Sequence, residues 1–434
     1  MILKKELGTV TLEKSDENVT GKMGLSFIYH SMKHFGLNDL IREIFPKAKQ
    51  RSNREETAEK KIFASTLSFI AGGERIEDIE ILRADKALIG SLGWNSMISP
   101  DTSRNFLMVN RNGGYLRQVN DAGNHNALKR CKETDLTYDS DATYFDSDKD
   151  SAEWSYKKER QFSAMLGFWA ELGTCNTMDF RPGNISPATG ILNQLRKATH
   201  QAASAGKRLA RFRNDSAGYQ YDILKWCEDH RIKYFISAKE TKAVKEIIGD
   251  LNEENWQKVP TEISLDKEKQ GVEWIETVHA MNDLSMRMMV LRWKNPRPDL
   301  FEQSEYCYHA IITNDCDMEP MDWLKFHNGR MGSENFNKEL KNGFHNDYAP
   351  SHDFVMNRNY FLLGVLAYNM TQWMKLFYLD PTASRWNIKR LRLWFLTTCG
   401  KLISHGRKII CRILNSTDET FGLFRYCMSR LVVV

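Results

Sequence analysis

Apolar residues recur at helical spacing in the first third of the chain. Leu25 and Ile28 fit one side of a helix, and a second helix is expected around residues 62–67. Residues 76–100 fit either a helix-turn-helix or two more helices of an ordinary bundle. We therefore expect residues 1–130 to form a mainly helical region.

The hydrophobic pattern changes near residue 131, where short alternating segments separated by turn residues replace the helical spacing. Such segments predict strands, and longer amphipathic stretches between them predict helices. In chain order, the expected elements are strands 136–145, 162–170 and 175–180, helix 187–204, strand 207–213, helix 219–230 and strand 232–238. The order β-β-β-α-β-α-β is that of a mixed α/β layer, which we place in residues 131–245.

Alternation of apolar and polar residues returns between residues 246 and 313, which predicts a mostly β insertion. Trp323 to Phe344 then reads as one continuous helix, in a second part of the core at residues 314–350. The next helix, near residues 354–377, is strongly apolar, and we expect residues 351–434 to form a helical C-terminal region.

The length of 434 residues predicts several structural units rather than one. The eight cysteines include no C-x-x-C pair, which argues against a zinc site and favours reduced, packed thiols in a cytosolic protein. The N-terminus lacks the apolar core of a signal peptide, and the best candidate for a membrane span, Tyr360 to Leu379, is interrupted by Asn369 and Lys375. We therefore expect a cytoplasmic protein without a membrane span.

The net charge of +5 is too small to identify a partner, but the basic residues are unevenly distributed. No acidic residue occurs between Pro381 and Arg412. The basic residues there are Arg385, Lys389, Arg390, Arg392, Lys401, Arg407, Lys408 and Arg412, with Trp386, Trp394 and Phe395 among them. A basic segment with interleaved aromatic residues is typical of a surface that binds phosphates, and a face that only keeps a helix soluble is the alternative.

Carboxylates at two places in the predicted α/β layer are candidates for chemistry. Asp139 and Asp141 lie two residues apart on a predicted strand, so they share a face. Asp215 follows a predicted strand where it runs into a turn, and a strand end of an α/β sheet is a common position for a site. Each aspartate taken alone is more simply read as a turn or capping residue.

The predicted helix at 323–344 carries a charged stripe. At about 100° per residue, His327, Arg330, Glu334 and Lys341 fall within roughly 60° of one another. One interpretation is a solvated face with an ion pair between Arg330 and Glu334. The other interpretation is a site in which a carboxylate lies between cations.

Two strand-borne aspartates and a helix-borne glutamate, in this order of elements, resemble the ribonuclease H-like DDE transposases of bacterial insertion sequences. His327, Arg330, Glu334 and Lys341 match the spacing Y-x2-R-x3-E-x6-K of the cut-and-paste group with a Tyr-Arg-Glu-Lys signature, with histidine in place of tyrosine. Within that group the chain is most similar to the thirteen-eighty family of insertion sequences. The supporting segments are DSDAT around Asp141, FRNDSAGY around Asp215, the RPGN turn, LAYNM around Asn369, and KRLRLWFL and GKLISHGRK near the end.

The resemblance implies a ribonuclease H-like catalytic core, interrupted by the β insertion and flanked by helical N-terminal and C-terminal regions, the first of them binding DNA. It places the catalytic and metal-binding acids on Asp141, Asp215 and Glu334, with Asp139 as the fallback for the first acid. Three carboxylates can hold two Mg²⁺ or Mn²⁺ ions about 4 Å apart for an in-line displacement at phosphorus.

The resemblance also implies the reaction and the partners. A transposase of this group binds terminal inverted repeats in double-stranded DNA, cleaves at the element ends through hairpinned intermediates, and joins the freed 3′-hydroxyls to target DNA, as a homodimer in the synaptic complex. The residues expected to contact DNA are His327, Arg330, Lys341, Lys389, Arg390 and Arg392. Two rival functions are a related metal-dependent nuclease without strand transfer and a catalytically silent DNA-binding derivative.

Overall fold

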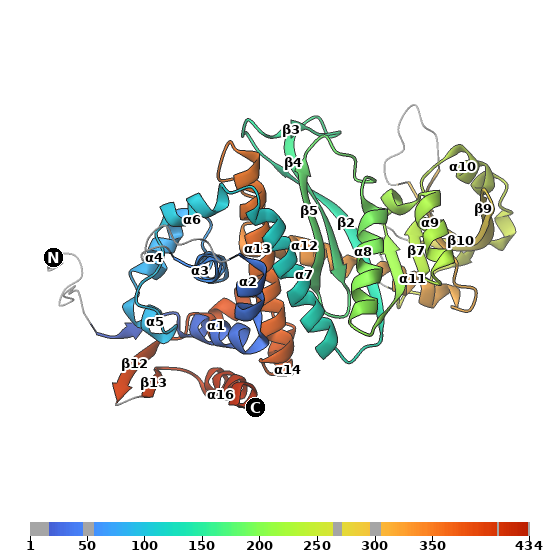
Figure 1. Ribbon diagram of the computed structural model, residues 1–434. Coiled ribbons are helices and arrows are strands. Elements are labelled where there is room, and N and C mark those ends of the chain that lie inside the picture. Colours follow the sequence, from blue (N-terminus) through green and yellow to red (C-terminus); the bar gives the residue numbers. More distant parts are fainter. Residues whose placement is uncertain (1–16, 47–55, 264–270, 296–304, 406–407, 433–434) are drawn as a thin grey trace, which may run out of the picture.

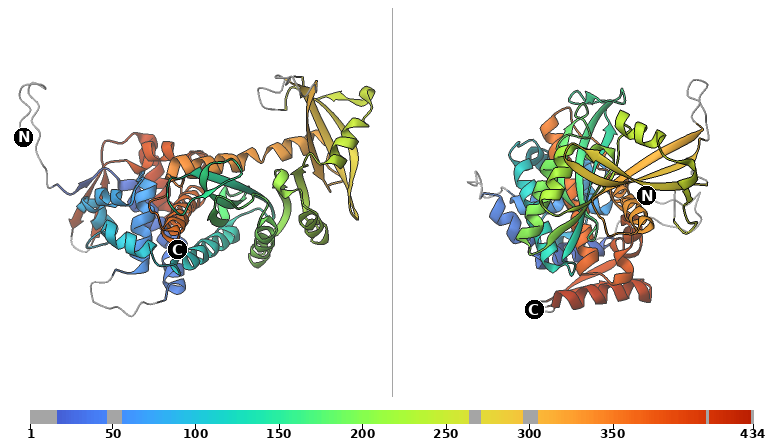
Figure 2. Two further views of the ribbon diagram at one scale, coloured as in Figure 1. Left: turned by 90° about the horizontal axis from the view of Figure 1, so that it is seen from above. Right: turned by 90° about the vertical axis from the view of Figure 1, so that its right-hand side faces the viewer.

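The computed structural model describes residues 17–46, 56–263, 271–295, 305–405 and 408–432 (Figure 1). Helices of the N-terminal region lie at one end of the molecule, a mixed sheet occupies the middle, and the strands between residues 257 and 313 lie at the other end. Figure 2 shows the same succession from above.

Short helices make up most of the described N-terminal region. They are α1 (Met23–Phe35), α2 (Leu37–Ile44), α3 (Ala58–Ala71), α4 (Ile79–Arg83), α5 (Lys86–Ser91), α6 (Pro100–Leu107) and α7 (Asn112–Arg130), with the 3₁₀ turn η1 (Ile76–Asp78) before α4 and strand β1 (Val19–Thr20) before α1. Gly36 ends α1 with a φ of +93°, a left-handed conformation that glycine adopts without strain. The apolar faces of these helices are buried, as Leu25 and Ile28 illustrate.

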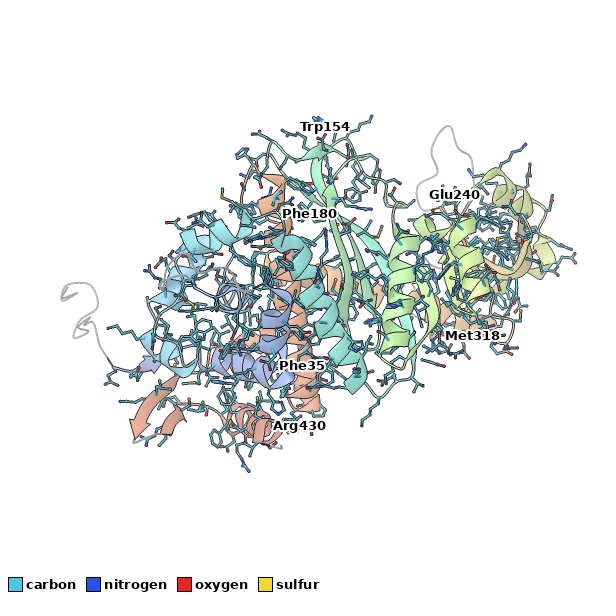
Figure 3. All side chains as sticks on the ribbon, in the orientation of Figure 1. Phe35, Trp154, Phe180, Glu240, Met318 and Arg430 are labelled. Carbon is cyan, nitrogen blue, oxygen red and sulfur yellow. The ribbon has the colours of Figure 1, made fainter. Side chains whose placement is uncertain are left out.

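Helix α13 (Phe354–Phe377) runs through the centre of the molecule between the N-terminal helices and the sheet (Figure 1). Phe180 of the sheet, labelled in Figure 3, packs on it with its ring 5.3 Å from that of Phe361. The polar Asn369 is buried in the same interface, where its Oδ1 accepts a hydrogen bond from the backbone N–H of Cys175 at 2.8 Å. In the described part of the chain, no helix has the length and apolar character needed to cross a membrane.

A mixed sheet forms the core, which confirms the mixed α/β class expected from the sequence. Its first five major strands in space are β5 (Thr174–Pro182), β4 (Arg160–Trp169), β2 (Asp135–Asp146), β6 (Arg208–Asn214) and β7 (Lys233–Ser237), and the two-residue β3 (Glu153–Trp154) also pairs with β4. The pairs β5–β4 and β4–β2 are antiparallel, whereas β2–β6 and β6–β7 are parallel. α8 (Ile191–Ser204) precedes β6, and α9 (Tyr221–Asp229) lies between β6 and β7, so the connection of each parallel pair contains a helix.

The strands of the expected insertion are hydrogen-bonded to this core sheet rather than forming a sheet of their own. β11 (Tyr306–Thr313) pairs antiparallel with β7, and β10 (Leu284–Lys294), β9 (Glu273–Met281) and β8 (Gln257–Lys258) continue outward in that order. The region begins with α10 (Lys242–Gly249) and the turn η3 (Glu253–Asn255), so its first residues are helical and not β as expected.

The expected single helix from Trp323 to Phe344 is wrong: it consists of α11 (Pro320–Asn328) and α12 (Met331–Phe344). Between them, the backbone N–H of Arg330 bonds three residues back instead of four, to the carbonyl of His327 at 3.0 Å. A Cβ on Gly329 would lie 2.4 Å from Nη1 of Arg213, so a residue larger than glycine would collide with that side chain. The regular helical hydrogen bonding is therefore interrupted between Asn328 and Met331.

The C-terminal region is not entirely helical, which corrects the expectation of a helical region at residues 351–434. After α14 (Pro381–Ser384), α15 (Ile388–Leu391) and the π-helical turn η4 (Arg392–Leu396), the chain forms the hairpin β12 (Gly400–His405) and β13 (Lys408–Ile413). β12 pairs antiparallel with β1, so the hairpin completes a three-stranded sheet with a strand from the other end of the chain. The last element is α16 (Asp418–Val432).

Candidate active site

Two aspartates come together because β2 and β6 run side by side in parallel. In their register Asp139 pairs with Arg213. Asp141 and Asp215 each come two residues after one member of that pair. Oδ1 of Asp215 accepts a hydrogen bond at 2.8 Å from a backbone N–H of the short helix η2 (Ser216–Gly218), which it caps. The two carboxyl groups therefore lie near each other at the point where the parallel pairing ends.

Asp139 forms an ion pair inside the protein. Its two oxygens accept hydrogen bonds from Nε and Nη2 of Arg213, both at 2.7 Å, and the residue is 0% exposed. Nη1 of Arg213 donates in turn to the carbonyl of Phe326, at the end of α11, at 2.8 Å. Because both carboxylate oxygens are occupied in a closed environment, Asp139 is structural here and Asp141 is the better candidate for the first acid.

Helix α12 lies against β2 beside Asp141. Nδ2 of Asn337 donates to Oδ2 of Asp141 at 2.9 Å, and one turn later Nζ of Lys341 donates to the carbonyl of Tyr144 at 2.6 Å. Glu334 precedes Asn337 by three residues, so both lie on the same side of the helix. These contacts bring the helix-borne glutamate toward the two strand-borne aspartates.

Glu334 is ion-paired with a cation from the turn that begins its own helix. Nη2 of Arg330 donates to Oε1 of Glu334 at 2.7 Å, with the arginine side chain 18% exposed and the glutamate side chain 51% exposed. An ion pair this open to solvent contributes little stability, about 0–1 kcal/mol. The carboxylate of Glu334 is therefore accessible and can exchange its partner.

The electrostatics show that the three acids influence one another. Burial is the main cause that raises the pKa of Asp141 to about 6; the charges of Asp215 and Glu334 act in the same direction, and the nearby Arg330 opposes them. Burial also lowers the pKa of Lys341. Asp141 is thus the centre of a cluster with excess negative charge.

This donor set is suited to a divalent cation. Carboxylate oxygens are the ligands that Mg²⁺ and Mn²⁺ prefer, and in the described residues each of Asp141, Asp215 and Glu334 has one oxygen that makes no hydrogen bond. A cation would also relieve the repulsion that raises the pKa of Asp141. Among the described residues, no three His, Cys, Asp or Glu side chains already form a metal-ligating group. A cation bound by Glu334 would compete with Arg330 for the same carboxylate.

His327 lies inside the protein, contrary to the expectation that it faces DNA with Arg330. It is 6% exposed, and its Nε2 lies 3.3 Å from Oγ of Ser237. Burial, followed by the charges of His309 and Arg330, lowers the pKa of His327 to about 3. His327 lies four residues after the fully buried Trp323 in α11, so the two residues share the buried face of that helix.

The three basic residues expected to contact DNA from the C-terminal region divide into two kinds. Lys389 and Arg390 are exposed on α15. Arg392 instead donates to the carbonyls of Phe69 and Ile70 at 2.9 Å each and of Gly343 at 2.6 Å, and burial lowers its pKa to about 10. Arg392 therefore joins the C-terminal ends of α3 and α12 and is not available to a phosphate.

Sequence reasoning missed two amides beside the acids. Nδ2 of Asn214 donates to the carbonyl of Ser140 at 2.7 Å, and Asn337 contacts Asp141 as described above. The available signal was position: one amide directly precedes a candidate acid, and the other follows Glu334 by one helical turn.

A mixed sheet with a carboxylate at each of two parallel strands, and a third on a helix packed beside them, defines a metal-dependent phosphoryl-transfer site of the DDE class. The family model described as transposase DDE domain, group 1, matches residues 4–432, and the chain belongs to this family. It is a DDE transposase, an enzyme that cleaves and transposes DNA.

The cryo-EM structure of the piggyBac transposase synaptic complex with hairpin DNA is similar to the chain at 10% sequence identity and a TM-score of 0.44, over 87% of this chain and 80% of that one. No curated protein matches the sequence.

Proposed function

We propose that this transposase binds terminal inverted repeats, cleaves DNA at the element ends, and joins the freed 3′-hydroxyls to target DNA. The observation that carries the proposal is the position of three acids from separate parts of the chain: Asp141 and Asp215 lie on or just after the adjacent parallel strands β2 and β6, and the helix that bears Glu334 is hydrogen-bonded to Asp141 through Asn337. A site that gathers negative charge at a partly exposed edge is suited to metal-assisted phosphoryl transfer and not to stability.

In this proposal Asp141, Asp215 and Glu334 hold two Mg²⁺ or Mn²⁺ ions. Bound divalent ions supply an activated attacking oxygen and stabilise the leaving oxygen in an in-line displacement. In the first step a water oxygen bonds to phosphorus and the P–O3′ bond breaks, which leaves a free 3′-hydroxyl. In the second step that hydroxyl attacks a phosphodiester of the target and displaces a 3′-oxygen there.

Arg330 and Lys341 flank Glu334 and are the residues that would orient the scissile phosphate. Arg330 already contacts Glu334, and its planar guanidinium can bind two phosphate oxygens at once. Lys341 is held by the Tyr144 carbonyl and contributes a positive charge beside Asp141. Lys389 and Arg390 extend the basic surface along α15, and a homodimer would supply one such site to each element end.

Cleavage of the element's own ends tests this function. The purified protein is incubated with duplexes that carry each inverted repeat and its flank, with Mg²⁺, with Mn²⁺, or with EDTA, in the presence of a supercoiled target. Metal-dependent cuts at the repeat boundary with joined products support the proposal. Cuts without joining would identify a nuclease, and binding without cuts would identify a silent derivative.

A further inference from the structure

Asn337 is positioned to control the carboxylate at the centre of the site. It is buried on α12, one turn after Glu334, and its Nδ2 donates to Oδ2 of Asp141 at 2.9 Å. Because an ionised carboxylate only accepts hydrogen bonds, the amide must present its nitrogen to Asp141. One side chain of the glutamate-bearing helix thus fixes the orientation of the strand-borne aspartate.

Asn214 makes a comparable link on the other side of Asp141. It is 1% exposed, directly precedes Asp215, and its Nδ2 donates at 2.7 Å to the carbonyl of Ser140, the residue before Asp141. Asp215 is thereby held at the level of Asp141 beyond the last residue pair of the parallel register. Asn337 therefore links the helix of Glu334 to the side chain of Asp141, and Asn214 links the residue before Asp215 to the backbone of Ser140.

The two amide side chains are unfavourable for the stability of the fold. Oδ1 of Asn337 and Oδ1 of Asn214 are both buried and make no hydrogen bond within the described part of the chain. A buried polar atom without a partner destabilises the fold, and an apolar residue of similar size would avoid that loss. Folding alone therefore does not explain why amides stand at these two positions.

We propose that Asn214 and Asn337 are positioning residues that hold Asp215 and Glu334 in register with Asp141 for divalent-ion binding. The inference rests on the proposed function, since it assigns the metal to these three acids. Hydrogen bonds to metal-binding carboxylates orient their lone pairs, and their removal typically weakens metal affinity by roughly 10–100-fold.

Asn337 offers the cleaner test because it contacts Asp141 itself. Asn337→Leu keeps a side chain of similar size that cannot donate and adds no charge, and Asn337→Ala removes the group altogether. Asn335→Ala is the matched control, because Asn335 is exposed on the same helix. Mn²⁺ binding to each protein, in complex with an end duplex, is titrated by electron paramagnetic resonance, next to end affinity by gel shift and single-turnover cleavage at saturating DNA.

Both Asn337 variants are expected to bind Mn²⁺ roughly 10–100-fold more weakly than wild type, with end affinity unchanged and cleavage recovered in part at high metal concentration. Asn335→Ala should match wild type. The proposal is overturned if Asn337→Leu, shown to be folded by circular dichroism, binds Mn²⁺ and cleaves as wild type does. Failure of the wild-type protein to cleave its own ends would instead overturn the proposed function.

Discussion

Nη2 of Arg330 donates at 2.7 Å to Oε1 of Glu334, the carboxylate that a metal ion would share. The guanidinium also opposes the charges that raise the pKa of Asp141, so it balances part of the site's negative charge without a cation. A metal bound at Glu334 would release Arg330 to contact a DNA phosphate, and a phosphate bound at Arg330 would release Glu334 to bind a metal. The two binding events would therefore be linked.

Arg330→Ala is expected to change metal binding and cleavage in opposite directions. Without its competing cation, Glu334 is free, and Mn²⁺ affinity of the DNA-free protein should rise by roughly two- to fivefold, the equivalent of a pair worth up to about 1 kcal/mol. End cleavage should fall because the phosphate loses a bidentate donor. Calorimetric Mn²⁺ titration and a cleavage time course measure the two effects, and a decrease of both would contradict this reading of Arg330.

Asp141 and Asp139 should separate catalysis from stability. Asp141→Asn is expected to abolish cleavage with end binding intact, as are Asp215→Asn and Glu334→Gln, because a ligand is lost without change to the basic surface. Asp139→Asn should instead destabilise the fold by about 3–5 kcal/mol, because it leaves Arg213 as a buried charge without its partner.

Urea unfolding and cleavage assays on the same preparations distinguish the two aspartates. If Asp139→Asn abolished cleavage at wild-type stability, the first acid would have been assigned to the wrong residue.

Local sequence patterns were sufficient for the core strands. Each end of the five expected core strands lies within two residues of the end observed for β2, β4, β5, β6 or β7, because these strands alternate regularly and turn residues bound them. Asp141 on a predicted strand and Asp215 after one were candidates from the same pattern, but their assignment as the first and second acids came from the resemblance to DDE transposases.

Features that depend on tertiary contacts were not predictable in this way. At the break between α11 and α12, Gly329 lies against Arg213, more than a hundred residues earlier in the chain, so the space available at this position depends on a distant side chain. The hairpin β12–β13 pairs with β1 from the opposite end of the chain, and Arg392 looks like a DNA contact until its three backbone acceptors are known. Each requires knowledge of a partner that no local pattern contains.

The basic C-terminal segment yields a prediction that separates Lys389 and Arg390 from Arg392. Replacing Lys389 and Arg390 by alanine should weaken binding to any duplex and reduce the slope of log affinity against log salt by about 1.8, the value for two lost phosphate contacts. Arg392→Ala should leave that slope unchanged and destabilise the protein by at least about 2 kcal/mol, through its three hydrogen bonds. Fluorescence anisotropy over a salt series and thermal unfolding give the two readouts, and an equal slope change in Arg392→Ala would place its guanidinium on the DNA.

His327 yields the last prediction, on the pH dependence of stability. Its pKa is lowered to about 3 in the folded protein by burial and by the charges of His309, Arg330 and Arg213, against about 6.5 in the unfolded chain. Between these values the unfolded chain binds one more proton than the folded protein, so stability falls as the pH drops below about 6.5. At pH 4.5 this group alone should have removed about 2–3 kcal/mol relative to pH 7.

His327→Gln, which keeps a polar group near Ser237 but cannot titrate, should therefore lose less stability than wild type over the same interval. Urea midpoints of both proteins at pH 7 and 4.5 measure the difference, and the remaining acid sensitivity, shared by both, comes from the carboxylates. Since the imidazole is neutral throughout the working range, end cleavage by His327→Gln should follow the same pH profile as wild type. A cleavage profile that lost a step near pH 6.5 in the variant would show that the histidine is charged and exposed to DNA in the working complex, and that α11 rearranges to present it.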